Sequence, residues 1–361
     1  MQYELITTPE GLALIGAEWR ELEARCPAHL FQSYDFAASW YACAGKASKA
    51  VLAVAVCREQ GVVRAIFPGC VISKAGVKFL TWLGGFFAVD YGDVLFDPSA
   101  SCEIEAFLEG ALTLLREKTG YHLCYLNNVR HDSPAYPYLK ACFREFRGDV
   151  APYIKLQGGF DTYLDSLKSF RKKQKSDTLR QIKRLSEAGQ LEFNIVSGRD
   201  TGASELLEAF FEQKRRRFRT SGVHGVLMMP GYEEFYRDQA LHNNAVHLAC
   251  LTLDGKIIAT HVGYLYNRRL YYLMPSYDHH YGGYSPGRVL AYYLIRECFE
   301  QEVEVFDFCI GSEEYKYEWT QDDVAITSFV SDTLPGRLFT LVKRGKIRVD
   351  EFLRSLKGIK T

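Results

Sequence analysis

A glycine-rich loop between an expected strand and an expected helix is the segment best suited to bind a ligand. It reads Tyr281-Gly-Gly-Tyr-Ser-Pro-Gly-Arg-Val-Leu290. Ser285 suits the N-cap of a helix, and Pro286 suits the first turn, where a missing N–H costs nothing. The N–H groups of Gly287, Arg288 and Val289 would then be free at the positive end of the helix dipole, where helices bind phosphate. The candidate donor-binding residues are Gly283, Tyr284, Ser285, Gly287, Arg288 and Val289, although a plain strand–turn–helix connection would use the same residue types.

A basic run in the middle of the chain is a second candidate for binding anions. The pattern over 161–188 predicts one long helix that ends at Gly189. Residues three and four apart are neighbours on a helix, so Lys173, Arg180 and Arg184 are expected near one face. Such a face could bind the phosphates of an acceptor. A charged, solvent-exposed helix explains the run equally well.

Two α/β domains are needed to position these groups. The chain has 361 residues, which is more than one core comfortably serves. Pro152 and Gly158-Gly159 mark a seam, so we expect one domain over 1–157 and a second over 158–361 that ends in a basic tail helix. The formal net charge is zero, which excludes a protein that coats nucleic acid with its whole surface.

The order of elements in the second half of the chain is similar to that of a known protein family. A hairpin leads to a strand, the glycine loop, a helix, a short buried strand and another short helix. The residues concerned include Tyr277-Asp278, Tyr284-Ser-Pro-Gly287 and Phe306-Asp-Phe-Cys-Ile-Gly-Ser-Glu-Glu-Tyr-Lys-Tyr-Glu-Trp319. This arrangement resembles the GNAT acyltransferase core, and more closely the FemABX-related branch with the CelD or BcsL exopolysaccharide and cellulose-locus acetyltransferases. The resemblance covers nearly the whole chain and implies an α/β (α+β) fold of tandem GNAT-like domains, each a mixed, mostly antiparallel sheet flanked by helices.

Acyl transfer to an amine needs a base for the amine proton, a donor for the oxyanion and an acid for the leaving thiolate. Asp307 or Asp278 could be the base, and Tyr315 the acid. The resemblance favours Lys316 as the oxyanion or phosphate clamp, because related Fem enzymes carry a lysine in a matching Tyr/Phe-Lys position. Glu313 and Glu318 are expected to be ordinary solvated side chains.

Several other side chains complete the candidate set. His261 lies in an expected strand, either as a base at the acceptor pocket or as a hydrogen-bonded structural histidine. Tyr272 and Trp319 are expected to contact the acceptor, although half-buried strands favour tyrosine anyway. The adjacent His279 and His280 lack the spacing of metal ligands, so no metal site is expected.

The sequence and the resemblance together predict an N-acyltransferase. The implied co-substrate is acetyl-CoA or another acyl-CoA, and the implied acceptor is an amino group of a sugar nucleotide or lipid-linked saccharide in bacterial surface-polysaccharide assembly. A membrane-associated glycosyltransferase complex is a further expected partner, and DNA is not. One alternative is Fem-like transfer from aminoacyl-tRNA to a cell-wall precursor, the only case in which tRNA is a partner. Another is a non-catalytic subunit of a polysaccharide machine. The expected location is the cytoplasm, with a peripheral position at the inner membrane face left open.

Overall fold

The computed structural model describes residues 2–198, 200–221 and 225–342. The chain divides into two compact units, which are built from interleaved segments. Unit 1 comprises Met1–Cys26, Lys49–Gly148 and the segment from Ile326 onward, and unit 2 comprises Pro27–Ser48 and Asp149–Ala325. Each unit is described by itself below.

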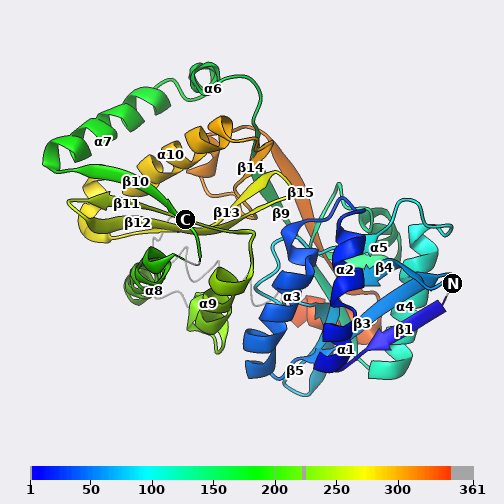
Figure 1. Ribbon diagram of the computed structural model, residues 1–361. Coiled ribbons are helices and arrows are strands. Elements are labelled where there is room, and N and C mark those ends of the chain that lie inside the picture. Colours follow the sequence, from blue (N-terminus) through cyan, green and yellow to red (C-terminus); the bar gives the residue numbers. More distant parts are fainter. Residues whose placement is uncertain (1, 199, 222–224, 343–361) are drawn as a thin grey trace. The chain divides into compact units, whose positions relative to one another are not determined.

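The core of unit 2 is a sheet in the order β10-β11-β12-β13-β14-β9 (Figure 1). These strands are β10 (Leu191–Val196), β11 (Val246–Leu253), β12 (Lys256–Tyr266), β13 (Arg269–Tyr277), β14 (Val305–Asp307) and β9 (Phe143–Lys155). The pairing is antiparallel except between β13 and β14, which run parallel. The expected hairpin turn at Asp254-Gly255 joins β11 to β12, and both residues have positive φ, as such a tight turn requires.

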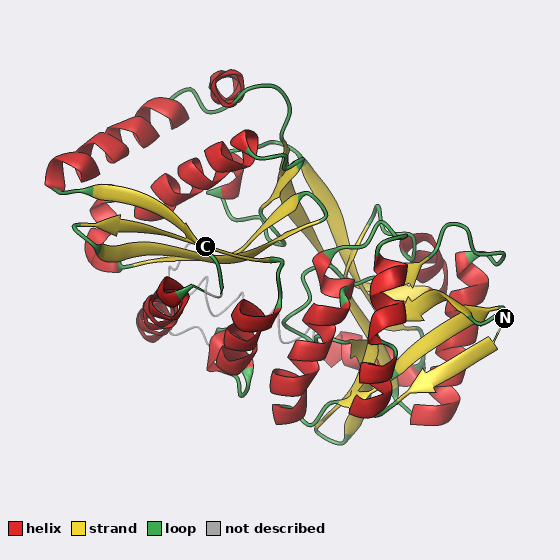
Figure 2. Cartoon of the chain, viewed as in Figure 1, coloured by secondary structure: helices red, strands yellow, loops and turns green. Residues whose placement is uncertain are grey.

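Helices cover both faces of this sheet (Figure 2). The helices of unit 2 are α3 (Tyr34–Trp40), α6 (Phe160–Ser166), α7 (Gln174–Ala188), α8 (Thr201–Ser221), α9 (Tyr232–His242) and α10 (Pro286–Glu300). Helices α7 and α10 lie on one face of the sheet, and α8 and α9 lie on the other. The buried side of α10, which includes Leu290, Leu294 and Ile295, packs on β11–β13 in one apolar core.

The single long helix predicted over 161–188 is wrong. The segment forms α6, the 3₁₀ turn Leu167–Ser169 and α7, which begins only at Gln174. The hydroxyls of Ser166 and Ser169 donate to carbonyl oxygens of the preceding turn, a local bond that competes with helix continuation. Lys173 therefore lies at the N-cap of α7, outside the helix that carries Arg180 and Arg184.

Unit 1 contains two sheets. One has the order β1-β3-β4-β7, from β1 (Gln2–Ile6), β3 (Val54–Glu59), β4 (Val62–Phe67) and β7 (Leu95–Phe96). The other has the order β15-β8-β6-β5-β2, from β15 (Asp323–Ser331), β8 (Leu123–Arg130), β6 (Val77–Trp82), β5 (Gly69–Lys74) and β2 (Val51–Leu52). The helices are α1 (Pro9–Leu14), α2 (Gly16–Glu23), α4 (Ile104–Thr119) and α5 (Tyr136–Cys142), and residues 334–342 are also helical.

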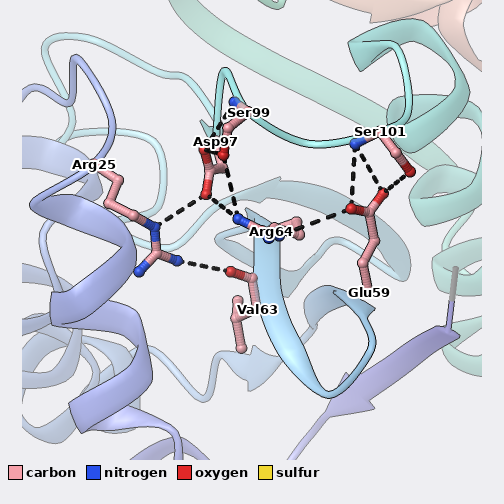
Figure 3. Close-up of polar contacts among 7 residues, drawn as sticks. All are labelled: Arg25, Glu59, Val63, Arg64, Asp97, Ser99 and Ser101. Atoms are coloured by element: carbon pink, nitrogen blue, oxygen red, sulfur yellow. Dashed lines mark hydrogen bonds and ion pairs between the residues drawn. The ribbon is translucent and has the colours of Figure 1, made fainter.

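A chain of ion pairs fixes one edge of unit 1 (Figure 3). Asp97, just after β7, accepts hydrogen bonds from Arg25 at 3.0 Å and from Arg64 at 2.9 Å. Arg64 also pairs with Glu59, whose carboxylate accepts from Ser101. These contacts join the end of α2, strand β4 and the loop after β7.

The predicted fold class is confirmed: both units consist of mostly antiparallel sheet with one parallel pair, flanked by helices. That parallel pair is β13–β14 in unit 2 and β6–β8 in unit 1. The compact units differ from the predicted division at 157/158 in three segments, 27–48, 149–157 and the residues from 326 onward. Residues 27–48 join unit 2, where Phe36 packs on Phe235 at 5.3 Å between ring centroids, and β15 pairs with β8 of unit 1. The described tail residues, 326–342, therefore belong with unit 1.

Candidate functional site

A cavity of about 720 Å³ lies in unit 2 where β13 and β14 part. The pairing of the two strands ends at Tyr271 and Asp307, whereas β13 continues to Tyr277. The edge of β13 beyond Tyr271 is therefore not paired with β14. The cavity is lined by Arg217, Tyr272, Pro275, Ser276, Tyr277, His279, Gly282, Ser285, Gly287, Arg288, Ala291, Tyr315, Glu318 and Trp319.

The glycine loop forms the wall at the start of α10, but its backbone differs from the predicted anion nest. Ser285 is left-handed, with φ of 51°, and its side chain makes no capping bond. Its carbonyl oxygen instead accepts from the amides of Arg288 at 3.0 Å and Val289 at 3.2 Å. The amides of Arg288 and Val289, two of the three that were expected to be free, therefore donate hydrogen bonds within the first turn of α10. The Gly287 amide takes no part in these bonds, and an added Cβ at Gly287 would meet only Tyr277, at 3.5 Å.

The other loop residues are held by α7. The Arg184 guanidinium donates to the Gly283 carbonyl oxygen at 3.0 Å and lies 4.9 Å from the Tyr284 ring centroid. Arg184 therefore connects α7 to the loop, and this contact occupies a guanidinium N–H that was predicted to bind an acceptor phosphate. Neither Gly283 nor Tyr284 is among the cavity-lining residues, and Val289 is fully buried.

Arg288 and Glu318 form an ion pair in the cavity wall. Both carboxylate oxygens of Glu318 accept from Arg288 Nη2 at 2.7 Å. The prediction that Glu318 is a solvated side chain is wrong, because folding brings the 3₁₀ turn Lys316–Glu318 to the start of α10. An anion that binds Arg288 must compete with this carboxylate.

Three predicted aromatic residues meet at the cavity: Tyr272, Tyr315 and Trp319. The Tyr163 hydroxyl donates to the Trp319 carbonyl oxygen at 2.8 Å and holds the segment in place. Tyr315 keeps 40% of its surface exposed, yet the protein around its phenol raises its pKa. Tyr315 is therefore protonated at neutral pH.

Asp307 is not at the cavity, contrary to the role of base predicted for it. It ends β14 with no exposed surface, and its carboxylate accepts from Arg269 at 2.8 Å and from the Cys309 amide at 2.8 Å. A buried carboxylate held by an arginine and a backbone amide is committed to the folded structure. It fixes the turn that follows β14.

Lys316 is likewise occupied by the protein. Its Nζ donates to the carbonyl oxygens of Cys309, Ile310 and Gly311 at 3.2, 2.7 and 3.2 Å, and Glu313 pairs with it at 2.9 Å. An ammonium has three N–H donors, so these partners saturate it. The side chain is nearly buried and is not among the cavity-lining residues. The predicted oxyanion clamp is, in this structure, the anchor of the loop after β14.

Asp278 caps the 3₁₀ turn His279–Tyr284 that leads to the cavity. Burial alone would raise its pKa, but the His280 side chain and amide, with Lys256, lower it to about 2. A carboxylate with so low a pKa is a weak base, which argues against the predicted alternative role.

Replacing Asp278 with asparagine should lower the free energy of unfolding at pH 7 by about 1–2 kcal/mol. This loss is smaller than the pKa shift alone would give, because His280 and Lys256 are exposed and solvent screens their charges. The folded pKa is depressed from 3.8, so this stabilisation is present above pH 3.8 and is lost as pH falls through about 2. Urea unfolding across this range should show the difference between the two proteins shrinking. A difference in unfolding free energy that does not change with pH would contradict an ionic origin of this stabilisation.

His261, on β12, is buried and stacks on Tyr272, with ring centroids 4.9 Å apart. Neither ring nitrogen has a hydrogen-bond partner within the described structure. Burial lowers its pKa well below 6.5, so the ring is neutral at pH 7. It is not among the cavity-lining residues, although Tyr272, which covers one of its faces, is.

The three basic residues predicted to bind an acceptor do not form one site. Lys173 precedes α7 and is exposed, and Arg180 is exposed beside Asp177 at 3.1 Å. Only Arg184 reaches the glycine loop. Arg217 and His279, which were not proposed as site residues, do line the cavity. The sequence signal for His279 is its position two residues before Tyr281, at the start of the glycine loop.

Comparisons with known proteins identify the class of the cavity-bearing region. Residues 172–317 match the family model described as "Acetyltransferase (GNAT) domain". This range includes every cavity-lining residue except Glu318 and Trp319. No curated protein matches the chain's sequence. Residues 172–317 of unit 2 are therefore similar to a GNAT-type acetyltransferase domain.

Solved structures share the fold at low sequence identity. FemX is 12% identical, with a TM-score of 0.64 over 95% of this chain and 100% of its own. The C-terminal domain of a putative lysylphosphatidylglycerol synthetase from Agrobacterium fabrum is 11% identical, with a TM-score of 0.58 over 91% of this chain and 96% of that domain. L-PGS from Bacillus licheniformis is 12% identical, with a TM-score of 0.56 over 93% and 96%. At these identities the likeness concerns the fold alone.

Proposed function

We propose that the protein is an N-acyltransferase that moves an acyl group, in the first instance acetyl, from acyl-CoA to an amine. The acceptor class is an amino group on a sugar nucleotide or lipid-linked saccharide of bacterial surface polysaccharide, as in the exopolysaccharide and cellulose-locus branch. The observation that carries the proposal is the tyrosine-lined cavity at the start of α10, inside the matched segment. Its volume, about 720 Å³, is within the usual range of small-molecule sites.

Two features support an extended, anionic donor. The edge of β13 beyond Tyr271 lacks β14 as a partner, so an extended amide chain can pair with it as a strand would. Gly287 stands at the positive end of α10 with room beside it, and this end favours a pyrophosphate. Among the described residues that line the cavity, Glu318 is the carboxylate that could repel such a donor, and it forms an ion pair with Arg288.

The reaction assigned to this cavity is direct transfer. The amine nitrogen attacks the thioester carbonyl carbon, the carbon–sulfur bond breaks, and the thiolate leaves with a proton from Tyr315. His279 is the imidazole of the cavity wall that can take the proton lost by the amine. Asp307 and Lys316 serve this chemistry only by fixing the loop that presents Tyr315.

Tyr315→Phe should lower kcat by about a hundredfold with little change in KM, because it removes the acid and keeps the ring. The measurement is release of free CoA thiol from acetyl-CoA, with glucosamine as the probe acceptor. Tyr277→Phe is the matched control, since it removes another hydroxyl from the same cavity and should change kcat by less than about threefold. Equal turnover by wild type and both variants would contradict the assigned role. No thiol release by the wild-type protein would favour a non-catalytic subunit.

A second candidate donor is aminoacyl-tRNA. The observation in its favour is the exposed basic surface of Lys172, Lys173, Arg180 and Lys183 at and beside α7, which suits a phosphate backbone. Transfer of radiolabelled amino acid from charged tRNA to a lipid-linked muropeptide, without turnover of acetyl-CoA, would establish this donor in place of acyl-CoA.

A further inference from the structure

Strand β10 is an open edge of the unit 2 sheet (Figure 1). On one side it pairs with β11, in continuous register from Leu191 opposite Leu253 to Val196 opposite Leu248. On its other side no strand of the described residues pairs with it. Proteins usually protect such an edge with lysine, proline or a bulge, because its unpaired N–H and C=O groups can pair with another chain. Strand β10 has none of these three features.

The pairing with β11 determines which backbone groups of β10 point outward. The Asp254 amide donates to the Gln190 carbonyl oxygen at 2.9 Å, so these two residues form a hydrogen-bonded pair. Hydrogen-bonded and non-hydrogen-bonded pairs alternate along an antiparallel ladder. The amides and carbonyl groups of Leu191, Phe193 and Ile195 therefore point away from β11, toward the open edge.

The side chains of β10 alternate between the two faces of the sheet. On one face, Phe193 packs against the apolar core and stacks on Tyr293 of α10, with ring centroids 5.4 Å apart. Ile195 follows on the same face and is 41% exposed. Glu192 and Asn194 are exposed on the opposite face. The edge therefore carries one carboxylate among apolar and neutral side chains.

We propose that β10 pairs antiparallel with β10 of a second copy of the chain, about a two-fold axis between the two Phe193 residues. The outward amides and carbonyls of the two strands then exchange about six hydrogen bonds. Leu191 of each copy lies opposite Ile195 of the other, so apolar side chains face each other. Glu192 lies opposite Asn194, whose amide can donate to the carboxylate.

Charge selects this partner and this register. An axis shifted to Glu192 would place two carboxylates directly opposite each other, which destabilises paired strands. In the proposed register one sequence complements itself, as a two-fold contact between identical chains requires. The basic residues of α7, the helix that precedes β10, oppose the contact little, because Arg180 pairs with Asp177 and Lys183 pairs with Glu187. The inference is independent of the reaction proposed for the cavity.

The test is analytical ultracentrifugation of the full chain in aqueous buffer, from about 1 to about 200 μM. No helix of the described residues is long and apolar enough to cross a membrane. Wild type should dimerise with a Kd of about 10 μM, since one pair of strands is a small contact. Ile195→Pro should weaken the dimer at least about tenfold, because proline removes an outward N–H that the fold of the monomer does not use. Thermal unfolding confirms that each variant is folded.

Two substitutions at Asn194 provide the matched control for the register. Asn194→Glu places a second carboxylate opposite Glu192 of the other copy, and symmetry makes this repulsion occur twice, so the dimer should weaken about tenfold. Asn194→Lys places an opposite charge there and should dimerise at least as well as wild type. The proposal is overturned if the two Asn194 variants dimerise equally, or if the dimer survives Ile195→Pro. It is also overturned if wild type stays monomeric at about 200 μM, which would leave the edge to a strand of a different protein.

Discussion

Asp307→Ala should lower the free energy of unfolding by about 3 kcal/mol, because it breaks the ion pair of a fully buried carboxylate. The carboxylate has no exposed surface, and its removal leaves the Arg269 guanidinium and the Cys309 amide without this acceptor. A buried hydrogen-bond donor left without an acceptor destabilises the folded protein by far more than a surface ion pair stabilises it. Urea unfolding of wild type and variant measures the difference from the shift in midpoint.

The control for this prediction is a double-mutant cycle with Arg269→Ala. In a protein that already carries Arg269→Ala, Asp307→Ala should lower the free energy of unfolding by measurably less, because the ion pair is already broken. If Asp307 were the catalytic base instead, the variant would keep its stability and lose only activity. Unchanged stability of Asp307→Ala would therefore refute the structural role derived from the ion pair.

Much of unit 2 could be predicted because its elements depend on neighbouring residues. The Asp254-Gly255 turn requires two positive φ angles, and this pair of residues adopts them readily. Pro286 likewise places the start of α10. The division into units could not be predicted this way. It depends on the pairing of β15 with β8, strands almost two hundred residues apart, and no local pattern records such a partner.

The candidate site shows the same limit at the level of side chains. The sequence predicted that Lys316 and Asp307 matter, but their roles follow from partners that only the fold brings close. Three backbone carbonyls surround Lys316, and Arg269 from a neighbouring strand reaches Asp307. Charge pattern alone assigned Glu318 to solvent, whereas α10 supplies the arginine that holds it in the cavity. The aromatic residues were easier to place, since Tyr272, Tyr315 and Trp319 lie in or next to buried segments.

Gly287→Asp should weaken acetyl-CoA binding by about a hundredfold or more, because it places a carboxylate next to the pyrophosphate. The two negative charges repel each other, and solvent at the protein surface screens this repulsion only in part. The substitution itself fits the backbone, since an added Cβ meets only Tyr277 at ordinary contact distance. Gly287→Ala is the matched control for added volume. It should bind acetyl-CoA within about threefold of wild type, because it introduces no charge.

The central claim, that the cavity at the start of α10 holds an acyl-CoA donor, is tested most directly by calorimetric titration of acetyl-CoA into these three proteins. We predict micromolar binding to wild type and to Gly287→Ala, and its loss in Gly287→Asp while all three unfold at similar temperatures. Equal binding to Gly287→Asp would place the donor elsewhere. Absence of binding to all three folded proteins would contradict acyl-CoA as the donor and direct the search to aminoacyl-tRNA.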